Sequence, residues 1–189
     1  MPKRQREGND LLSLKVMGSD GEIHPLKQII KQPTVLVFQP GASHADQWKN
    51  RDEALKQWMT IPGAPGCTTQ IKKYNDLREA FLQCGWELAV IMSHKTKTDL
   101  SSIHEQQKLL FPIYSLTEES IQDLESKKHP CFVFEGKTYP HRWTCLVNDD
   151  GEISRALDRR NIVPMQEPGQ TLEELKNLLE PECLYKPTK

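Results

Sequence analysis

The segment at residues 61–70 (IPGAPGCTTQ) restricts the fold more than any other part of the chain. Proline and glycine at residues 62–63 and again at 65–66 exclude a helix and predict a tight loop. Residues 68–82 then contain neither Gly nor Pro, and their apolar side chains recur at helical spacing. A rigid loop therefore delivers Cys67 to the first turn of a helix. Free backbone N–H groups and the positive end of the helix dipole favour a thiolate there, which makes Cys67 a candidate nucleophile rather than an ordinary buried cysteine.

Apolar runs and turn residues divide the rest of the chain into strands and helices. Strands are predicted at residues 11–17, 22–24, 34–38, 87–92, 111–116, 131–135, 143–148 and 152–156. Helices are predicted at residues 25–31, 45–59, 68–82, 98–110, 117–128 and 171–179. Turns are predicted at residues 18–21 and 148–151, and a loop at 158–170. Thr98 is the expected cap of its helix, and Gly85 is expected to end the Cys67 helix. The order of these elements predicts an α/β fold in which helices flank a central mixed sheet.

Residues 45–59 are predicted to form an amphipathic helix just before the Cys67 loop. Ser43 stands three residues before Asp46, which is typical of a helix start. The apolar side chains that fall close to one helical face are Trp48, Leu55, Trp58 and Met59. We expect this face to pack against the domain, because a partner surface is the less common fate of an apolar face.

The whole chain has the length of one domain with a sizeable core. Of the 189 residues, we assign 10–182 to one domain and 1–9 and 183–189 to terminal tails. Within the domain, residues 41–60 form an inserted helical segment. The net charge is −1 with both signs interspersed, so neither a nucleic-acid nor a membrane partner is expected. No apolar run has the length needed to span a bilayer, and no signal sequence follows the first methionine. Five cysteines without CxxC spacing fit a reducing compartment and predict a cytoplasmic protein. The six histidines lack metal-ligand spacing, so no metal site is expected.

Further motifs occur downstream of Cys67 in a recognisable order. They are residues 65–70 (PGCTTQ), residues 136–139 (GKTY), His141-Arg142, and a frame of Asp20-Gly21, residues 34–40, 90–93 and 148–151. With these motifs the chain resembles the peroxiredoxin family over roughly residues 10–180, and within it the peroxiredoxin Q or bacterioferritin comigratory protein group. The resemblance implies a thioredoxin-like fold of the peroxiredoxin type, in which residues 41–60 add a helix before the catalytic helix.

The resemblance also implies a thiol-dependent peroxidase that reduces hydrogen peroxide or organic hydroperoxides through a sulfenic acid. Cys67 would be the peroxidatic nucleophile, and Arg142 would stabilise its thiolate and the developing oxyanion. The residues that would line the pocket are Thr60, Pro65, Gly66, Thr68 and His141. No metal or organic cofactor is implied. The reductant would be a thioredoxin-like protein or a small thiol, and the protein would be a monomer or a homodimer.

Two departures from the family pattern concern the active-site loop. Thr60 stands where the family has a proline, and Ala64 stands where it has a threonine whose hydroxyl hydrogen-bonds the peroxide and the thiolate. Loss of one such oriented donor lowers a rate by on the order of 100-fold. The insertion at residues 41–60 also separates Pro40, which resembles the family's strand-end proline, from Cys67. These departures favour an alternative, a catalytically weak redox sensor or protein-binding domain of the same fold.

The sequence leaves the resolving cysteine open. The group often carries it at the position that Lys72 occupies in this chain. Cys84 is a candidate, but it lies about 25 Å from Cys67 along an intact helix. Cys131 precedes a strand and is the better intramolecular candidate. Cys183, near the C-terminus, is the candidate for a disulfide between two chains. Cys145 is expected to be buried in a strand. A one-cysteine mechanism with an external thiol is equally open.

Overall fold

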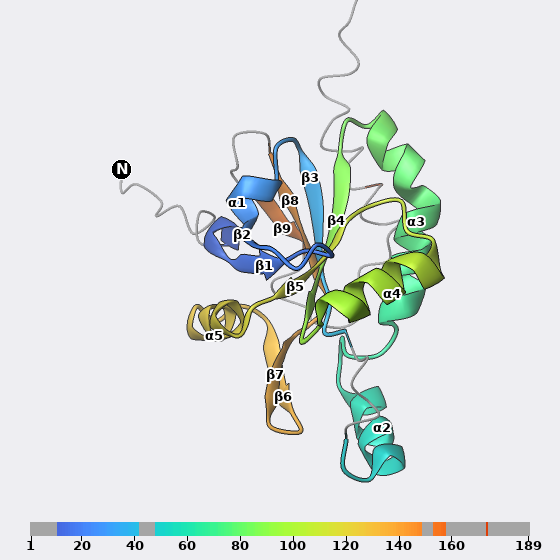
Figure 1. The fold of residues 1–189 in the computed structure, drawn as a ribbon, viewed down its shortest axis with the longest axis vertical. Coiled ribbons are helices and arrows are strands. Elements are labelled where there is room, and N and C mark those ends of the chain that lie inside the picture. Colours follow the sequence, from blue (N-terminus) through green and yellow to red (C-terminus); the bar gives the residue numbers. More distant parts are fainter. Residues whose placement is uncertain (1–10, 42–47, 149–152, 158–172, 174–189) are drawn as a thin grey trace, which may run out of the picture.

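Strand β3 (Thr34–Phe38) lies inside a seven-stranded sheet whose order is β2-β1-β5-β4-β3-β8-β9. The computed structural model describes residues 11–41, 48–148, 153–157 and 173. The other strands of this sheet are β1 (Lys15–Met17), β2 (Ile23–Pro25), β4 (Glu87–Ser93), β5 (Ile113–Leu116), β8 (Trp143–Val147) and β9 (Ile153–Leu157). The helices are η1 (Leu11–Ser13, a 3₁₀ turn), α1 (Leu26–Ile29), α2 (Arg51–Thr60), α3 (Cys67–Gln83), α4 (Lys97–Gln107) and α5 (Glu118–Ser126). Figure 1 shows α3 and α4 on one side of the sheet and α1 and α5 on the other.

The sheet is mixed, as predicted. Strand β3 runs parallel to β4, and β4 runs parallel to β5. Strand β8 is antiparallel to both β3 and β9, and β1 is antiparallel to both β5 and β2. The carboxyl ends of β3 and β4 therefore lie at the same edge of the sheet, which is where binding and catalytic groups commonly gather in α/β folds.

The two faces of the sheet carry separate hydrophobic clusters because side chains alternate along each strand. Val35 and Val37 face the cluster under α3 and α4, which includes Tyr74 and Phe81 of α3. Leu36 and Phe38 face the second cluster, which is covered by η1, α1 and α5. All five residues of β3 are buried, as expected for a strand covered on both faces.

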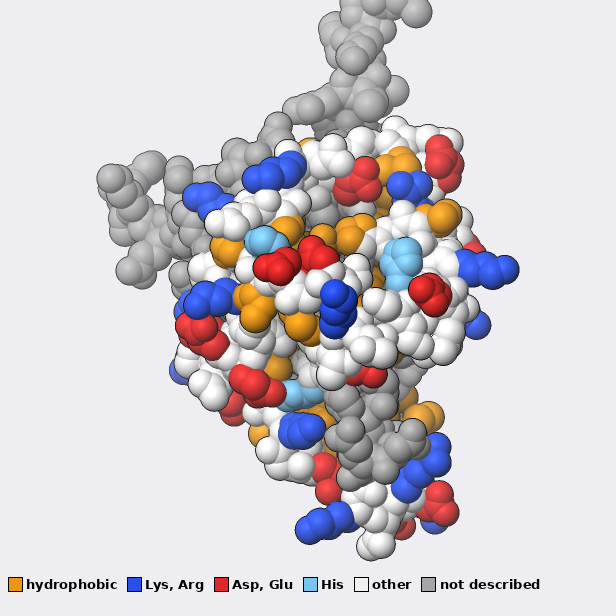
Figure 2. Space-filling model, in the orientation of Figure 1, with side chains coloured by type: hydrophobic (Ala, Val, Ile, Leu, Met, Phe, Trp, Pro, Cys, Tyr) orange, Lys and Arg blue, Asp and Glu red, His pale blue; other side chains and the backbone are white. Residues whose placement is uncertain are grey.

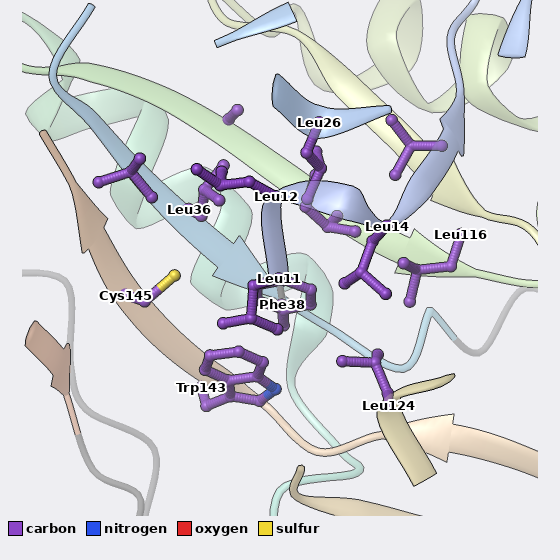
Figure 3. Close-up of a cluster of buried hydrophobic side chains, with 14 of the residues drawn as sticks. Leu11, Leu12, Leu14, Leu26, Leu36, Phe38, Leu116, Leu124, Trp143 and Cys145 are labelled. Carbon is purple, nitrogen blue, oxygen red and sulfur yellow. The ribbon is translucent and has the colours of Figure 1, made fainter. Parts of the chain in front are cut away.

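Residues 11–14 differ from the prediction of a continuous strand. They form the 3₁₀ turn η1 and a single residue before β1. Figure 3 shows why the apolar pattern misleads: Leu11, Leu12 and Leu14 converge on the cluster that contains Phe38 and Trp143. A strand would send alternate side chains to opposite faces, whereas this turn buries all three leucines together. The rings of Phe38 and Trp143 stack there with centroids 4.0 Å apart.

A third, smaller cluster lies outside the main sheet. Strands β6 (Cys131–Phe134) and β7 (Lys137–Pro140) form a separate two-stranded sheet, so the GKTY motif is the turn and second strand of a hairpin. Figure 1 shows this hairpin and α2 projecting from the same end of the molecule. Trp58 of α2 packs its ring against Phe134 and Tyr139 of the hairpin, each with a centroid distance of 5.3 Å. We refer to α2, β6, β7 and their shared cluster as the satellite.

The tryptophans of the inserted segment therefore pack on the domain, as expected, but the predicted helix face is wrong. Helix α2 begins at Arg51, after Asn50 in a left-handed conformation, and the part of the prediction at residues 42–47 lies outside the described residues. Leu55 and Met59 are 43% and 60% exposed, so they do not share the buried face of Trp58.

Helix α4 begins earlier than predicted. Thr96, not Thr98, caps it: the Thr96 hydroxyl accepts a hydrogen bond from the Asp99 amide, and the Thr96 amide donates to the Asp99 carboxylate. This reciprocal pair is a capping box, which satisfies two donors at the helix start. Strand β5 also begins later than predicted, at Ile113 after Pro112, because proline cannot donate to a sheet.

The other predicted elements within the described residues agree with the structure to within a few positions. Gly85 follows the end of α3 with φ of +79°, as the predicted helix stop requires. The predicted tails at 1–9 and 183–189, the turn residues 149–151, the loop at 158–170 and most of the helix at 171–179 lie outside the described residues. On the face shown in Figure 2, Lys and Arg side chains are interspersed with Asp and Glu. None of the described helices has the length and apolar character needed to cross a membrane.

Candidate active site

Cys67 is the first residue of α3, at the position that the sequence predicts. Gly66 precedes it as the N-cap in a left-handed conformation with φ of +91°, and no Gly or Pro interrupts the helix up to Gln83. The backbone of Gly66 accepts the first intrahelical hydrogen bond, from the Gln70 amide at 3.0 Å. Cys67 therefore lies where the free N–H groups of the helix start and the positive end of its dipole meet.

The sulfur of Cys67 is surrounded by groups with opposing effects on its pKa. Burial raises the pKa of the Cys67 thiol, while a backbone hydrogen bond from Gly41 and the charges of Arg142 and Lys95 lower it. The net direction of this pKa shift is upward, and the role of Cys67 as a nucleophile stays a prediction. In its protonated form the thiol lies 3.5 Å from the carbonyl oxygen of Ala64. The Gly41 amide, Arg142 and Lys95 are the three groups that can stabilise a Cys67 thiolate against the effect of burial.

Arg142 lies where its guanidinium contacts the loop that precedes Cys67. It comes just before β8, and its Nε donates to the carbonyl oxygen of Gly63 at 3.0 Å. A Cβ atom on Gly66 would stand only 3.0 Å from Arg142 Nη1, so the loop approaches the guanidinium as closely as glycine allows. Arg142 thereby lies against the residue that precedes Cys67 and lowers the pKa of that thiol.

His141, the neighbour of Arg142, also contacts the loop that precedes Cys67. Its Nδ1 lies 2.7 Å from the carbonyl oxygen of Pro62, and the backbone of Cys131 supplies a second hydrogen-bond partner to the ring. Consecutive side chains, His141 and Arg142, therefore contact the consecutive carbonyls of Pro62 and Gly63. Burial lowers the pKa of His141, so the ring is neutral near pH 7.

A cavity of about 340 Å³ opens beside Cys67. Its wall is formed by Gln39, Gly41, Trp58, Ala64, Gly66, Cys67, Thr68, Ile71, Met92, Lys95, Ile103, Gln106 and Gln107. Of the predicted pocket residues, the structure brings Gly66 and Thr68 to this wall. Ala64 presents a methyl group there and no hydroxyl.

The remaining predicted pocket residues lie elsewhere. Thr60 is exposed at the end of α2, and its hydroxyl donates to the carbonyl oxygen of Gln57 at 2.7 Å, so it does not replace the missing threonine hydroxyl. Pro65 belongs to the loop but does not line the cavity. His141 does not line it either, and its ring contacts the loop at the Pro62 carbonyl oxygen. Only part of the predicted pocket is therefore brought together.

Lys95 belongs to the site although no sequence motif marks it. It is only 5% exposed, and its Nζ donates to the carbonyl oxygen of Gly41 at 2.5 Å. Burial lowers the pKa of Lys95 to about 8, against the opposing effects of Asp99 and Cys67. Its ammonium group and the Cys67 thiolate thus favour each other across one wall of the cavity.

Two glutamines connect the end of β3 to the start of α3. Gln39 Nε2 donates to Gln70 Oε1 at 2.8 Å and lies 3.4 Å from the carbonyl oxygen of Cys67. Gln39 is fully buried, and Gln70 is nearly so. Gln39, like Lys95, is a site residue that the motifs did not predict. A signal existed for both, because each follows the carboxyl end of a buried parallel strand.

The candidate resolving cysteines within the described residues are not bonded to Cys67. Among the described residues, Cys67, Cys84, Cys131 and Cys145 form no disulfide, and Cys183 lies outside that part of the chain. Cys84 caps the far end of α3, and Cys145 is fully buried within β8. Burial, together with the charge of Glu125, raises the pKa of Cys131 to about 12, which makes its thiol a poor nucleophile as it stands. Within the described part of the chain, no group of three or more His, Cys, Asp or Glu residues has the arrangement of a metal site.

Comparison with known proteins identifies the fold. No family model and no curated protein sequence matches the chain. Among solved structures, the bacterioferritin comigratory protein of Xanthomonas campestris superposes with a TM-score of 0.59 at 17% identity, covering 89% of this chain and 93% of its own. Peroxidoxin BcpB of Mycobacterium tuberculosis gives 0.62 at 16% identity, with coverages of 94% and 98%. A thioredoxin-family thiol:disulfide interchange protein of Chlorobium tepidum gives 0.56 at 12%, with 94% and 99%. The chain therefore has the thioredoxin-like fold seen in peroxiredoxin Q structures, as predicted.

Proposed function

We propose that this protein is a thiol-dependent peroxidase whose nucleophile is Cys67. The observation that carries the proposal is the position of Cys67 at the start of α3, on the wall of a cavity, with the Gly41 amide, Arg142 and Lys95 all acting on its sulfur. The fold likeness supports the same reaction class, since the Xanthomonas structure is described in terms of alkyl peroxide reduction. Fold alone is a weak guide to function, so the site is the main support.

In the proposed reaction the Cys67 thiolate attacks one oxygen of the peroxide bond. A sulfur–oxygen bond forms, the oxygen–oxygen bond breaks, and the leaving alkoxide or hydroxide takes up a proton from water. Sulfur loses two electrons to the peroxide and becomes a sulfenic acid. The Arg142 guanidinium and the Gly41 N–H stabilise the negative charge on the Cys67 sulfur before the attack and on the reacting oxygens during it.

The size of the cavity favours organic hydroperoxides alongside hydrogen peroxide. Its volume of about 340 Å³ far exceeds the room that one small peroxide needs, and Ile71, Met92 and Ile103 give it apolar walls. Burial of an apolar substituent against these walls makes the free energy of binding more favourable.

A second thiol must reduce the sulfenic acid, and we propose that it comes from another molecule. Cys84 and Cys145 are remote from the start of α3 or enclosed in a strand, and the pKa of Cys131 is raised to about 12. A one-cysteine cycle with a thioredoxin-like protein or a small thiol as the reductant fits these features best. The cytoplasmic location and the monomeric or homodimeric state remain predictions.

The test is the second-order rate of Cys67 oxidation by hydrogen peroxide and by cumene hydroperoxide, followed by stopped-flow tryptophan fluorescence. Cys67→Ser is the control, because it keeps the size of the side chain and removes the nucleophile. We expect oxidation at least about 100-fold faster than for a free thiol, as oriented stabilising groups provide. A rate equal to that of a free thiol, or one that persists in Cys67→Ser, would contradict the proposal.

A second candidate is a redox sensor or binding domain with weak catalysis. Three observations favour it: the methyl group of Ala64 on the cavity wall, the raised pKa of Cys67, and the exposed Leu55 and Met59 on the satellite. Slow but specific oxidation of Cys67, with no turnover when a thiol reductant is added, would favour this candidate over the peroxidase.

A further inference from the structure

Lys95 is a buried amine that shares a cavity wall with Cys67. Only 5% of its surface is exposed, and both residues line the same cavity. Lysine side chains are almost never buried to this extent unless partners hold the ammonium group. Because a strongly perturbed ionisable group in a cavity is typical of a functional site, Lys95 is a candidate for a chemical role beside the proposed nucleophile.

Gly41 holds both groups. Its carbonyl oxygen accepts a hydrogen bond from Lys95 Nζ at 2.5 Å, and its N–H donates to the Cys67 sulfur. The end of the lysine side chain also packs on the Gly41 backbone, since a Cβ atom there would stand 2.9 Å from Lys95 Cε and 3.4 Å from Nζ. The N–H and the carbonyl group of one residue are separated by a single Cα atom. The amine and the sulfur are therefore held by adjacent polar groups, and each affects the charge of the other.

The environment of Lys95 favours the neutral amine, which is the nucleophilic form. Burial lowers its pKa to about 8, while Asp99 and the Cys67 thiolate act in the opposite direction. At pH 8, about half of such amines are neutral, against less than about 1% of ordinary lysines. A neutral sulfenic acid on Cys67 lacks the charge of the thiolate, so oxidation of the sulfur shifts Lys95 further towards the neutral amine.

We propose that the Lys95 amine condenses with the Cys67 sulfenic acid to form a reversible sulfur–nitrogen bond, a sulfenamide. The Nζ lone pair attacks the sulfur, the sulfur–oxygen bond breaks, and the hydroxyl group leaves as water with one hydrogen of the amine. The sulfur keeps the oxidation state of the sulfenic acid, so no further oxidant is needed. Sulfenic acids condense with a backbone nitrogen in the same way. The inference rests on the proposed function, because the peroxide supplies the sulfenic acid.

The sulfenamide takes the place of a resolving disulfide in the proposed cycle. Among the described cysteines none is bonded to Cys67, and the pKa of Cys131 is raised to about 12. Excess peroxide converts a free sulfenic acid irreversibly to sulfinic acid, whereas condensation removes the sulfenic acid from that reaction. An external thiol then attacks the sulfur: a disulfide with that thiol forms, the sulfur–nitrogen bond breaks, and the Lys95 amine leaves with the proton of the thiol.

The direct test is the mass of a cross-linked peptide from the full-length protein. The reduced protein is treated with equimolar hydrogen peroxide, its remaining thiols are blocked with N-ethylmaleimide, and it is cleaved after glutamate. Cleavage releases residues 54–79, with Cys67 as their only cysteine, residues 88–105, with Lys95 and no cysteine, and Cys84 in a third peptide. We expect the first two peptides to be joined, with a combined mass lower by about 2 Da through the loss of two hydrogens, and dithiothreitol to separate them.

Three variants identify the nitrogen. Lys95→Arg keeps a positive charge beside Cys67 but carries a guanidinium that stays protonated, and Lys95→Met removes both charge and amine. Lys97 lies on the same peptide and is exposed, so Lys97→Met is the matched control. We expect both Lys95 variants to lose the cross-link and Lys97→Met to keep it. A cross-link that persists in Lys95→Arg, or one that disappears in Lys97→Met, would overturn the proposal.

A second readout is the overoxidation of Cys67 by excess hydrogen peroxide. Sulfinic acid is measured as the gain of two oxygen atoms, located on Cys67 by fragmentation of its peptide, and its rate is divided by the rate of sulfenic acid formation. We expect this ratio to be at least about fivefold higher in Lys95→Arg than in the unmodified protein, because a neighbouring amine competes effectively with a second peroxide molecule. Equal ratios in the two proteins would count against a bond that protects the sulfur and would overturn the proposal.

The outcome is separable from that of the peroxidase proposal. Dimedone, which labels sulfenic acids, reports the oxidation of Cys67 independently of any cross-link. If Cys67 is oxidised no faster than a free thiol, the peroxidase proposal fails, and prolonged exposure to peroxide still supplies the sulfenic acid with which the cross-link is tested. If Cys67 is oxidised rapidly and dimedone labels it, yet the two peptides stay separate, the sulfenamide proposal fails and the peroxidase proposal stands.

Discussion

Gly66 shows how one residue links the catalytic loop to Arg142. Its φ of +91° is costly for any side chain, and a Cβ there would stand 3.0 Å from Arg142 Nη1. Gly85, at the other end of α3, has φ of +79°, but a Cβ at that position would meet no atom within 4 Å. The two glycines therefore share a backbone conformation that would strain any other residue, and they differ in what surrounds them.

This difference predicts distinct outcomes for two alanine variants. Gly66→Ala and Gly85→Ala should each lose about 1–3 kcal/mol in the free energy of unfolding, measured in urea. Only Gly66→Ala should also slow the alkylation of Cys67, because the guanidinium must move away from the loop. A similar alkylation rate in both variants would show that Arg142 does not act on the sulfur through this contact.

Lys95 provides the second prediction at the scale of one residue. Its ammonium group lowers the pKa of Cys67 against the larger effect of burial, so Lys95→Met should raise that pKa further. The alkylation rate of Cys67 should then fall several-fold at about pH 8, and its rise should move to higher pH. Lys97→Met is the matched control, since Lys97 is exposed and donates to the carbonyl oxygen of Asp20 at 2.7 Å. An unchanged pH profile in Lys95→Met would contradict the assigned interaction.

The site residues differ in how far the sequence predicts them. Cys67 and Arg142 carry recognisable motifs, and the structure brings both to the start of α3. Lys95 lies in the polar stretch SHKTK, where lysine is normally exposed. Its burial depends on Gly41, which is distant in sequence and whose carbonyl oxygen accepts a hydrogen bond from Lys95 Nζ. Gln39 follows an apolar strand without any local signal for the partner that holds its amide. The preceding apolar strands place both residues at one edge of the sheet, but their burial and their partners depend on long-range packing.

At the scale of elements, the same distinction separates α3 from α2. Helix α3 and strands β3 and β4 agree with prediction because their apolar patterns are long or bounded by Pro and Gly. Helix α2 has a buried face set by the hairpin, which lies far along the chain, so its own pattern places Leu55 and Met59 wrongly. Local pattern predicts the first strand of the hairpin, yet it does not predict that the hairpin is separate from the main sheet.

Because its hydrophobic cluster is separate from those of the main sheet, we expect the satellite to unfold locally while the sheet stays folded. Trp58→Ala should destabilise α2 and the hairpin by about 3–5 kcal/mol, because the ring contacts Phe132, Phe134 and Tyr139. Amide hydrogen exchange should quicken in α2 and remain unchanged in β3 and β4. Leu55→Ala, on the exposed side of the same helix, should change stability by less than about 0.5 kcal/mol. Equal acceleration of exchange throughout the sheet would show that the satellite and the domain unfold as one unit.

At the scale of the whole molecule, residues 141–142 connect three parts. They lie between the end of β7 in the satellite and the start of β8 in the main sheet, and both side chains contact the loop before Cys67. The His141 amide also donates to the carbonyl oxygen of Pro130 at 2.9 Å, next to the start of β6. The satellite, the sheet and the catalytic loop are therefore joined at one point, so a change there should affect all three.

The pKa of His141 turns this junction into a prediction about acid stability. Burial lowers that pKa in the folded protein, so between the folded value and about pH 6.5 the unfolded chain binds more protons than the folded one. Stability conferred by the neutral ring is therefore present above about pH 6.5 and is lost as the pH falls through the folded pKa. The free energy of unfolding in urea should drop between about pH 7.5 and about pH 5.5, and His141→Gln should reduce that drop while lowering stability at pH 7.5 by about 1–3 kcal/mol. His104→Gln, on α4, is the comparison variant that replaces a histidine outside the junction. If His141→Gln keeps the full acid sensitivity, the sensitivity arises from other groups and the junction is not its source.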